Sequence, residues 1–261
     1  MIQIENLDFS YKHTTVLTSI NLEIEQGDFL GLIGPNGSGK STLLKIISGI
    51  LTPAKGEVLL KQKALSQFDK QELAKIISFL PQDYHPFHDI KVHQVVMLGR
   101  IPYFYDRFFE NQQDISETQM AMKIAEIDHL SDRTIQELSG GEKQLVYIAK
   151  LIAQKTEIMI LDEPTTFLDI KHVIQIMNII KKLNSEESVT VIASMHDLNL
   201  AAMYCKKIVM LKKGSVLCTG IPKEVFTYER IKSAFDTEFY IDENDLTGEP
   251  IFLPLSPKSR L

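Results

Sequence analysis

The glycine-rich segment GPNGSGKST, residues 34–42, constrains the fold of this chain more than any other feature. An apolar run, residues 29–33, precedes it, and residues 43–48 follow with helical spacing, so the segment joins a buried strand to a helix. Gly34, Gly37 and Gly39 permit positive φ and a close approach of the backbone, and successive N–H groups then face an anion. The sequence therefore predicts an α/β fold with a phosphate-binding loop.

Within this loop, Lys40 is expected to hold the outer phosphates of a nucleotide and Ser41 a Mg²⁺ ion. The alternative is a flexible loop with an incidental lysine, and the flanking strand and helix argue against it. The whole predicted cradle consists of Gly34, Pro35, Asn36, Gly37, Ser38, Gly39, Lys40, Ser41 and Thr42.

A second short apolar run, EIMILDEP at residues 157–164, ends in two carboxylates. Open parallel sheets bind ligands at the carboxyl ends of their strands, so Asp162 and Glu163 are expected beside the phosphate loop. Asp162 would support the Mg²⁺ through water, and Glu163 would accept a proton from the water that attacks the γ-phosphate. Acidic pairs also end strands merely because they face solvent, but the phosphate loop favours the functional interpretation.

The segment LSGGEKQ, residues 138–144, precedes a helical run at residues 145–153. Its exposed N–H groups, the helix dipole and the Ser139 hydroxyl would suit a phosphate, with Gly140, Gly141 and Glu142 completing the turn. In isolation the segment is equally consistent with an ordinary serine-capped helix. Its position shortly before the acidic pair is what makes the pattern specific.

This order of motifs resembles the ATP-binding subunit of an ABC transporter over nearly the whole chain. The resemblance implies ATP and Mg²⁺ as cofactors, Tyr11 stacking on adenine, Gln82 as the Q-loop residue near the Mg²⁺ and the catalytic centre, Asp169 as the D-loop acid and His196 as the switch histidine. Taken alone, Tyr11 would be a core strand residue, Gln82 a loop start and His196 a hydrogen-bonded structural histidine.

In that family two copies meet head to tail, and the signature segment of one closes over the ATP of the other, so the resemblance implies a dimer. Two positions depart from the commonest pattern: Glu142 and Lys143 replace Gln and Arg in the signature, and the D-loop reads TTFLD. Residues 96–106 (VMLGRIPYFYD), PTTFLDIKH and the tail resemble importers of iron–siderophore, haem and cobalamin. Zinc or manganese importers remain the nearest alternative.

The resemblance implies ATP hydrolysis that drives import through a separate membrane permease, served indirectly by an extracytoplasmic substrate-binding protein. A non-transport ABC ATPase, acting in cofactor assembly or on nucleic acid, is the alternative from another class. Such proteins usually carry long inserts or basic arms, and none is visible here. A nucleotide-binding regulator without turnover is disfavoured because Glu163 and His196 are both present.

Composition agrees with a peripheral protein on the cytoplasmic side of the membrane. The 261 residues are 44% hydrophobic with a net charge of −6, which argues against nucleic acid as a partner. No apolar run approaches the ~20 residues that span a bilayer, and the start lacks a signal sequence. Cys205 and Cys218 make no disulfide framework.

The expected organisation is an ATPase domain at residues 1–221, with a mainly parallel sheet in a P-loop NTPase core, an N-terminal antiparallel β subdomain and an inserted α-helical subdomain at about 83–153. Further strands are expected near Ile76, Ile158, Val189, Ile208 and Val216, with a crossover helix at residues 170–182. The tail, residues 222–261, is expected to form short helices and loops packed on the core. His85, His88 and His93 could suggest zinc, but a solvated or docking loop is favoured.

Overall fold

The computed structural model describes residues 1–82, 90–104, 109–245, 248 and 250–255. The chain divides into two compact units. The first unit comprises Met1–Gln67 and Ile192–Leu261, and the second comprises Phe68–Val191. Among the described residues, no helix combines the length and the apolar character that crossing a bilayer requires.

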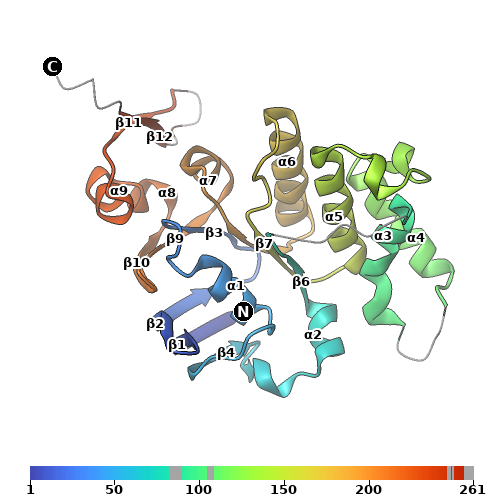
Figure 1. Ribbon diagram of the computed structural model, residues 1–261, viewed down its shortest axis with the longest axis horizontal. Helices are drawn as coiled ribbons and strands as arrows, with labels where there is room; N and C mark the ends of the chain where they lie inside the picture. The colour runs from blue at the N-terminus through green and yellow to red at the C-terminus, as the bar shows by residue number, and fades with distance from the viewer. Residues whose placement is uncertain (83–89, 105–108, 246–247, 249, 256–261) are drawn as a thin grey trace. The chain divides into compact units, whose positions relative to one another are not determined.

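The N-terminal part of the first unit is an antiparallel sheet with the strand order β2-β1-β4-β5 (Figure 1). Its central strand alternates buried apolar residues with exposed polar ones, which is the pattern of a sheet with one face on a core. This confirms the predicted antiparallel β subdomain. The strands are β1 (Ile2–Tyr11), β2 (Thr14–Ile24), β4 (Lys55–Leu60) and β5 (Lys63–Ala64), and the 3-10 helix η1 (Leu65–Gln67) follows them.

The strand that leads into the phosphate loop, β3 (Phe29–Ile33), is buried on both faces. All of its residues are buried, and it runs parallel to β9 (Lys207–Lys212). Strand β10 (Ser215–Gly220) is antiparallel to β9. Continuous burial explains why β3 reads as an unbroken apolar run while β1 alternates. The same unit holds α1 (Lys40–Ile47) and α7 (Leu198–Tyr204).

Gly31, in the middle of β3, makes room for a cysteine. A Cβ at this position would lie 2.8 Å from the Cys205 Sγ atom, so any larger residue would displace the thiol. Cys205 is buried, and burial raises the pKa of its thiol. The other cysteine, Cys218, is partly exposed, and the structure gives both as free thiols, as the sequence predicted.

The tail of the first unit differs from its prediction. It contains the expected short helices, α8 (Pro222–Val225) and α9 (Tyr228–Phe235), but it then forms an antiparallel pair of strands, β11 (Phe239–Glu243) and β12 (Pro250–Pro254). The side chain of Asn199 in α7 donates to the Phe252 carbonyl at 3.2 Å and accepts from the Phe252 N–H at 2.8 Å. This pair of hydrogen bonds attaches β12, and with it the tail, to helix α7 of the same unit.

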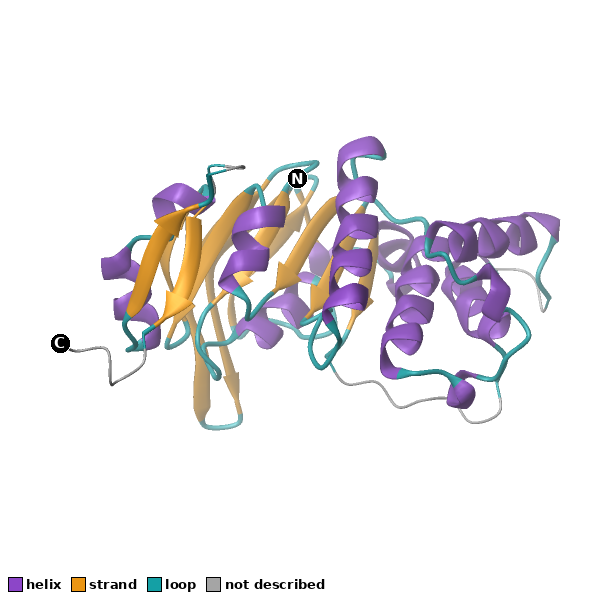
Figure 2. Ribbon diagram, turned by 90° about the horizontal axis from the view of Figure 1, so that it is seen from above, coloured by secondary structure: helices purple, strands orange, loops and turns teal. Residues whose placement is uncertain are grey.

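The second unit contains strands β6 (Ile77–Leu80) and β7 (Ile158–Asp162), which run parallel. The chain between them is mostly helical, as Figure 2 shows, which confirms the predicted helical insertion. Strand β8 (Thr190–Ser194) crosses the division between the units. The helices of the second unit are α2 (Lys70–Ile76), α3 (Val92–Met97), α4 (Gln112–Ile124), α5 (Gly140–Gln154) and α6 (Ile170–Glu186), with 3-10 helices η2 (Leu98–Tyr103), η3 (Asp128–Leu130) and η4 (Ile135–Glu137).

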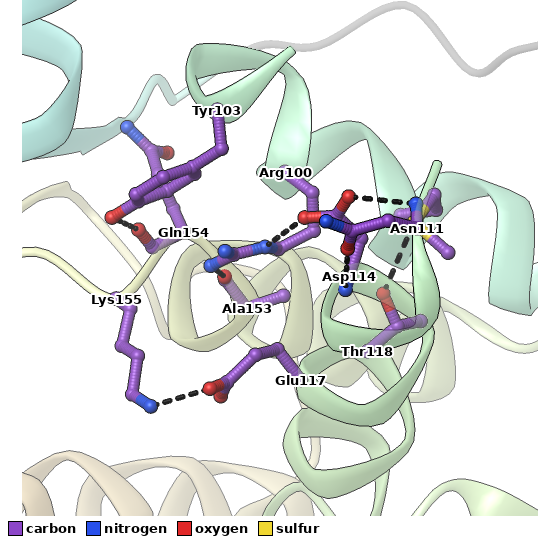
Figure 3. A network of polar contacts seen from close by, with 10 residues as sticks. Arg100, Tyr103, Asn111, Asp114, Glu117, Thr118, Ala153, Gln154 and Lys155 are labelled. Carbon is purple, nitrogen blue, oxygen red and sulfur yellow. Dashed lines mark hydrogen bonds and ion pairs between the residues drawn. The ribbon is translucent and has the colours of Figure 1, made fainter. Parts of the chain in front are cut away.

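A buried ion pair joins η2, α4 and α5 in this unit (Figure 3). Arg100 and Asp114 are 3% and 1% exposed, and the Arg100 Nε atom lies 3.2 Å from the Asp114 Oδ1 atom. The guanidinium also donates to the Ala153 carbonyl at 2.7 Å and stacks 3.9 Å from the centroid of the Tyr103 ring. The charge of Arg100 is thus compensated on several sides, as a buried cation requires.

Candidate functional site

The phosphate loop, residues 34–39, leaves β3 and enters α1 with the positive φ angles that its glycines predicted. At Gly34 a Cβ would lie 2.3 Å from the Leu211 carbonyl oxygen, so the loop passes too close to β9 for any other residue. Gly39 is the N-cap of α1, with φ 102° and no capping side chain. The first turn of α1 therefore begins without a side chain over its N–H groups, which suits an anion.

Lys40 is buried within the loop that it follows. Its Nζ atom donates to the Gly34 carbonyl at 2.8 Å and to the Pro35 carbonyl at 3.3 Å. The ammonium therefore lies across the start of the loop, within reach of a ligand that enters it. Ser38 is 2% exposed, and its hydroxyl has no hydrogen-bond partner among the described residues. A buried ammonium, an orphaned hydroxyl and an open helix start fit a phosphate.

Tyr11 and His196 also belong to the first unit. Tyr11 ends β1 and is 46% exposed, with its ring edge-on to Phe9 at a centroid distance of 4.8 Å. Tyr11 is thus a strand residue that packs on the buried Phe9 and remains partly exposed, and its stacking on adenine stays a prediction. His196 is exposed in the turn between β8 and α7, directly before Asp197, which caps α7 through bonds from the Asn199 and Leu200 N–H groups.

In the second unit, the structure brings Gln82 and Glu163 together. Asp162 ends β7 with 2% exposure, and Glu163 follows it with φ 53°, a left-handed conformation that only an over-determined environment holds. The Gln82 side-chain amide donates to the Glu163 Oε2 atom at 2.8 Å. Thr166, which the sequence analysis did not single out, donates to the same oxygen at 3.2 Å. Hydrogen bonds from two side chains thus fix the orientation of Glu163, the predicted general base.

The signature helix α5 begins with a reciprocal cap. The Ser139 hydroxyl accepts from the Glu142 N–H at 3.3 Å, and the Ser139 hydroxyl and N–H both donate to the Glu142 Oε2 atom, at 2.7 and 2.8 Å. These bonds from Ser139 hold the pKa of the Glu142 carboxyl below its usual range. The ordinary serine cap that the sequence left open is therefore present. A Cβ built at Gly140 would meet no atom within 4 Å beyond its chain neighbours and its own helix, so this side of the turn is open.

A histidine that the sequence analysis missed lies against the signature helix. Asp169 caps α6, accepting from the His172 N–H at 3.0 Å, and its other oxygen lies 2.8 Å from the His172 Nδ1 atom. Hydrogen bonds from His172 lower the pKa of Asp169. A Cβ at Gly141 would lie 2.4 Å from the ring of His172, so the ring occupies the space beside this glycine. Only side-chain contacts reveal this role, because α5 and α6 are separate in sequence.

Two large apolar side chains of the D-loop are exposed to solvent. Phe167 is fully exposed with φ 62°, and Ile170 is 81% exposed. They flank the Asp169 cap on either side in sequence. Burial of these two side chains against another surface would remove a large apolar area from water.

Of the three histidines in the predicted cluster, only His93 lies among the described residues. His85 and His88 lie outside the described residues. The Nδ1 atom of His93 bonds to the Ser131 carbonyl at 2.9 Å. In the described parts of the chain, no group of three His, Cys, Asp or Glu residues is placed to hold a metal ion.

The predicted site residues thus fall into two groups. The expectation that the phosphate loop and the acidic pair serve one ATP stays a prediction. The first unit holds Tyr11, residues 34–42 and His196, and the second holds Gln82, Ser139, Gly140, Gly141, Glu142, Asp162, Glu163 and Asp169.

A model of the ABC transporter family matches residues 17–166, from strand β2 through the acidic pair. This chain belongs to the ABC transporter family. It is an ATP-binding ATPase, and its similarity to relatives extends beyond the matched region. The ferric enterobactin transport ATP-binding protein FepC of Escherichia coli (strain K12) is 38% identical, covering 96% of this chain and 93% of FepC. The iron(3+)-hydroxamate import ATP-binding protein FhuC of Bacillus subtilis (strain 168) is 35% identical, covering 95% and 93%.

Solved structures of ABC proteins share the fold. An ABC transporter of the proposed metal-chelate type, in an inward-facing conformation, superposes with a TM-score of 0.86 at 26% identity, covering 98% of both chains. The dimeric structure of the bacterial ABC transporter cassette MJ0796 superposes with a TM-score of 0.75 at 32% identity, covering 85% of this chain and 98% of MJ0796. The predicted fold class is therefore confirmed.

Proposed function

We propose that this ABC ATPase powers the import of an iron–siderophore complex, or of a related metal chelate such as haem or cobalamin, through a separate membrane permease. The observation that supports this cargo best is the extent of the similarity. The match to FepC, a ferric enterobactin transport protein, covers 96% of the chain and so includes part of the tail beyond residue 221. The described tail is clasped to its own unit through Asn199, so it belongs to the same folded body.

In this proposal each group of site residues has a role toward ATP. The loop at residues 34–42 binds the phosphates, Lys40 neutralises their outer charge and Tyr11 stacks on adenine. The Ser41 hydroxyl, the Asp162 carboxylate and the Gln82 amide are oxygen ligands of the kind that Mg²⁺ takes directly or through water. When bound, Mg²⁺ would neutralise the charge that develops on the transferred phosphoryl group.

Glu163 is the proposed general base for the attacking water, and His196 is proposed to sense the γ-phosphate. The geometry around Glu163 supports its role, because Gln82 and Thr166 both donate to one carboxylate oxygen. These bonds fix the orientation of the carboxylate, which in this proposal accepts a proton from the attacking water. Neutralising this carboxylate as Glu163→Gln would keep its shape and remove its basicity.

The proposed working ATPase is a head-to-tail dimer of this chain. The signature residues Ser139–Glu142 of one copy would close over the ATP held by the other, with Asp169 near the same interface. The bare apolar side chains of Phe167 and Ile170 support a protein contact here, since burying them would remove their area from water. The dimeric MJ0796 structure, at 32% identity, is a precedent for dimerisation in the family.

The remaining predictions define the setting. We propose that the permease docks on the segment from Gln82 to Asp106, that an extracytoplasmic binding protein delivers the chelate, and that the chain lies at the cytoplasmic face of the membrane. The ATPase domain is proposed to cover residues 1–221, with a helical subdomain at about 83–153 and the tail at 222–261.

Reconstitution tests this function. The chain and its permease would be copurified and placed in proteoliposomes with internal ATP, and uptake of a ferric siderophore, cobalamin, haem, Zn²⁺ and Mn²⁺ would be compared. The proposal expects ATP-dependent uptake of a chelate and none with Glu163→Gln. Uptake of free Zn²⁺ or Mn²⁺ in place of every chelate would overturn the assignment of the cargo.

A further inference from the structure

Two capping boxes of the same design stand in succession in the second unit. In the first, the Glu137 Oε2 atom accepts from the N–H and the hydroxyl of Thr134, at 2.7 and 3.0 Å. In the second, the Glu142 Oε2 atom accepts from the N–H and the hydroxyl of Ser139, at 2.8 and 2.7 Å. The pKa of each glutamate is lowered, chiefly by hydrogen bonds from its partner, so both are ionised at neutral pH.

Only the second box lies at the signature. There, the hydroxyl and the N–H of Ser139 both point to one carboxylate oxygen. The proposed function places Ser139 over the ATP of the partner copy, where these donors would face its phosphates. A phosphate that docks on α5 must therefore draw Ser139 away from Glu142, and it must approach an ionised carboxylate.

The surroundings of Glu142 offset this charge only in part. Arg133 and His172 are the neighbouring groups whose charge favours the ionised carboxylate. The His172 ring is itself bonded to the Asp169 carboxylate at 2.8 Å, so an anion on α6 faces the same region. The adjacent Lys143 begins the next turn of α5 and adds a cation there.

We propose that Glu142 sets the affinity of the signature for ATP: its carboxylate retains the donors of Ser139 and repels the γ-phosphate, so it weakens ATP-driven dimerisation of this chain. This rests on the head-to-tail dimer of the proposed function. Glutamine completes a capping box as glutamate does, with an amide oxygen as a weaker and uncharged acceptor. Glu142→Gln therefore keeps the cap and removes the repulsion.

The experiment measures dimerisation in a background that cannot turn over ATP. Sedimentation velocity with saturating Mg²⁺ and ATP would compare three proteins. One carries Glu163→Gln alone, the second adds Glu142→Gln to it, and the third adds Glu137→Gln instead. The last is the matched control, since it removes the same charge from the same kind of cap outside the signature. Calorimetric binding of ATP to each diluted monomer verifies that each variant is folded.

Glu142→Gln is expected to lower the dissociation constant of the dimer about tenfold at low salt, while Glu137→Gln changes it less than about twofold. The gain should shrink toward 1 M salt, where the Debye length falls to about 3 Å. A purely structural role would give the opposite result, a weaker dimer at every salt concentration.

Equal or weaker dimerisation by Glu142→Gln, with a parent variant that dimerises normally, would overturn this role of Glu142 alone. A set in which all three variants bind ATP and remain monomeric would overturn the head-to-tail dimer, and the role of Glu142 with it. An equal gain from Glu137→Gln would show a general effect of net charge and would also overturn the proposal.

Discussion

Replacing Asp114 with Asn should destabilise the second unit strongly, because it leaves Arg100 buried without a counter-charge. The Asp114 Oδ1 atom lies 3.2 Å from the Arg100 Nε atom, and the Oδ2 atom accepts from the Asn111 N–H at 3.0 Å. Both carboxylate oxygens therefore face donors. An amide has only one oxygen, so in Asp114→Asn its NH₂ group must face one of these donors in a site that is 1% exposed.

Breaking a buried ion pair by removing one partner costs about 3–5 kcal/mol. In Asp114→Asn the amide oxygen can still accept one of the two hydrogen bonds, so the expected loss in free energy of unfolding lies near the lower end of this range, at about 3 kcal/mol. With about 2–4 °C of melting temperature per kcal/mol for a chain of this size, the expected fall is about 6–12 °C. Urea and thermal unfolding, followed by circular dichroism, would measure both quantities.

The same network contains the matched control (Figure 3). The Lys155 Nζ atom lies 2.5 Å from the Glu117 Oε1 atom, and Lys155 and Glu117 are 63% and 20% exposed, well above the exposure of Arg100 and Asp114. Glu117→Gln also removes one carboxylate charge, and at such a surface the cost should stay below about 1 kcal/mol. Combining Arg100→Met with Asp114→Leu removes both buried charges, so this pair should be less destabilised than Asp114→Asn. Equal costs for Asp114→Asn and Glu117→Gln would refute the argument that burial makes the first pair critical.

Three further outcomes test the proposed nucleotide site. Lys40→Ala should weaken ATP binding and turnover together, because the ammonium serves ground and transition states alike; unchanged ATP affinity by calorimetry would contradict this. Tyr11→Ala should weaken ATP binding by about 1 kcal/mol and leave the maximal rate nearly intact, and a lower rate without loss of affinity would remove Tyr11 from base stacking. Gly141→Asp should leave ATP binding to the monomer unchanged but abolish turnover, since the new side chain displaces His172 and adds an acid to the signature; normal hydrolysis would exclude the shared site.

The phosphate loop could be predicted from sequence because its constraints are local. Glycines at fixed offsets, an apolar run before them and a helical pattern after them specify strand, turn and helix together, and the structure has all three. The position of Gln82 beside Glu163 was also accessible, since β6 and β7 run parallel and both residues follow the ends of these strands.

Contacts between elements that are far apart in sequence could not be predicted in this way. His172 has an ordinary place in the pattern of α6, and only the packing of its ring against Gly141 reveals its position. Arg100 and Asp114 look like surface residues in sequence, since charged residues are seldom fully buried. The strand pair in the tail was missed because β11 has no fully buried residue, and β12 is held by hydrogen bonds to the side chain of Asn199, which is distant in sequence.

The cysteine behind β3 gives the first unit a built-in chemical probe. Cys205 is 6% exposed, its pKa is raised by burial, and its Sγ atom lies 2.8 Å from where a Cβ of residue 31 would stand and 3.6 Å from the Met195 Sδ atom. An alkylating reagent can therefore reach this thiol only when the strands beside the phosphate loop separate. The slow phase of thiol labelling would then report the opening free energy of the core that supports the loop. Ligand binding to that loop would lower the population of the open state, so the time of this phase would grow exponentially with the free energy that binding adds.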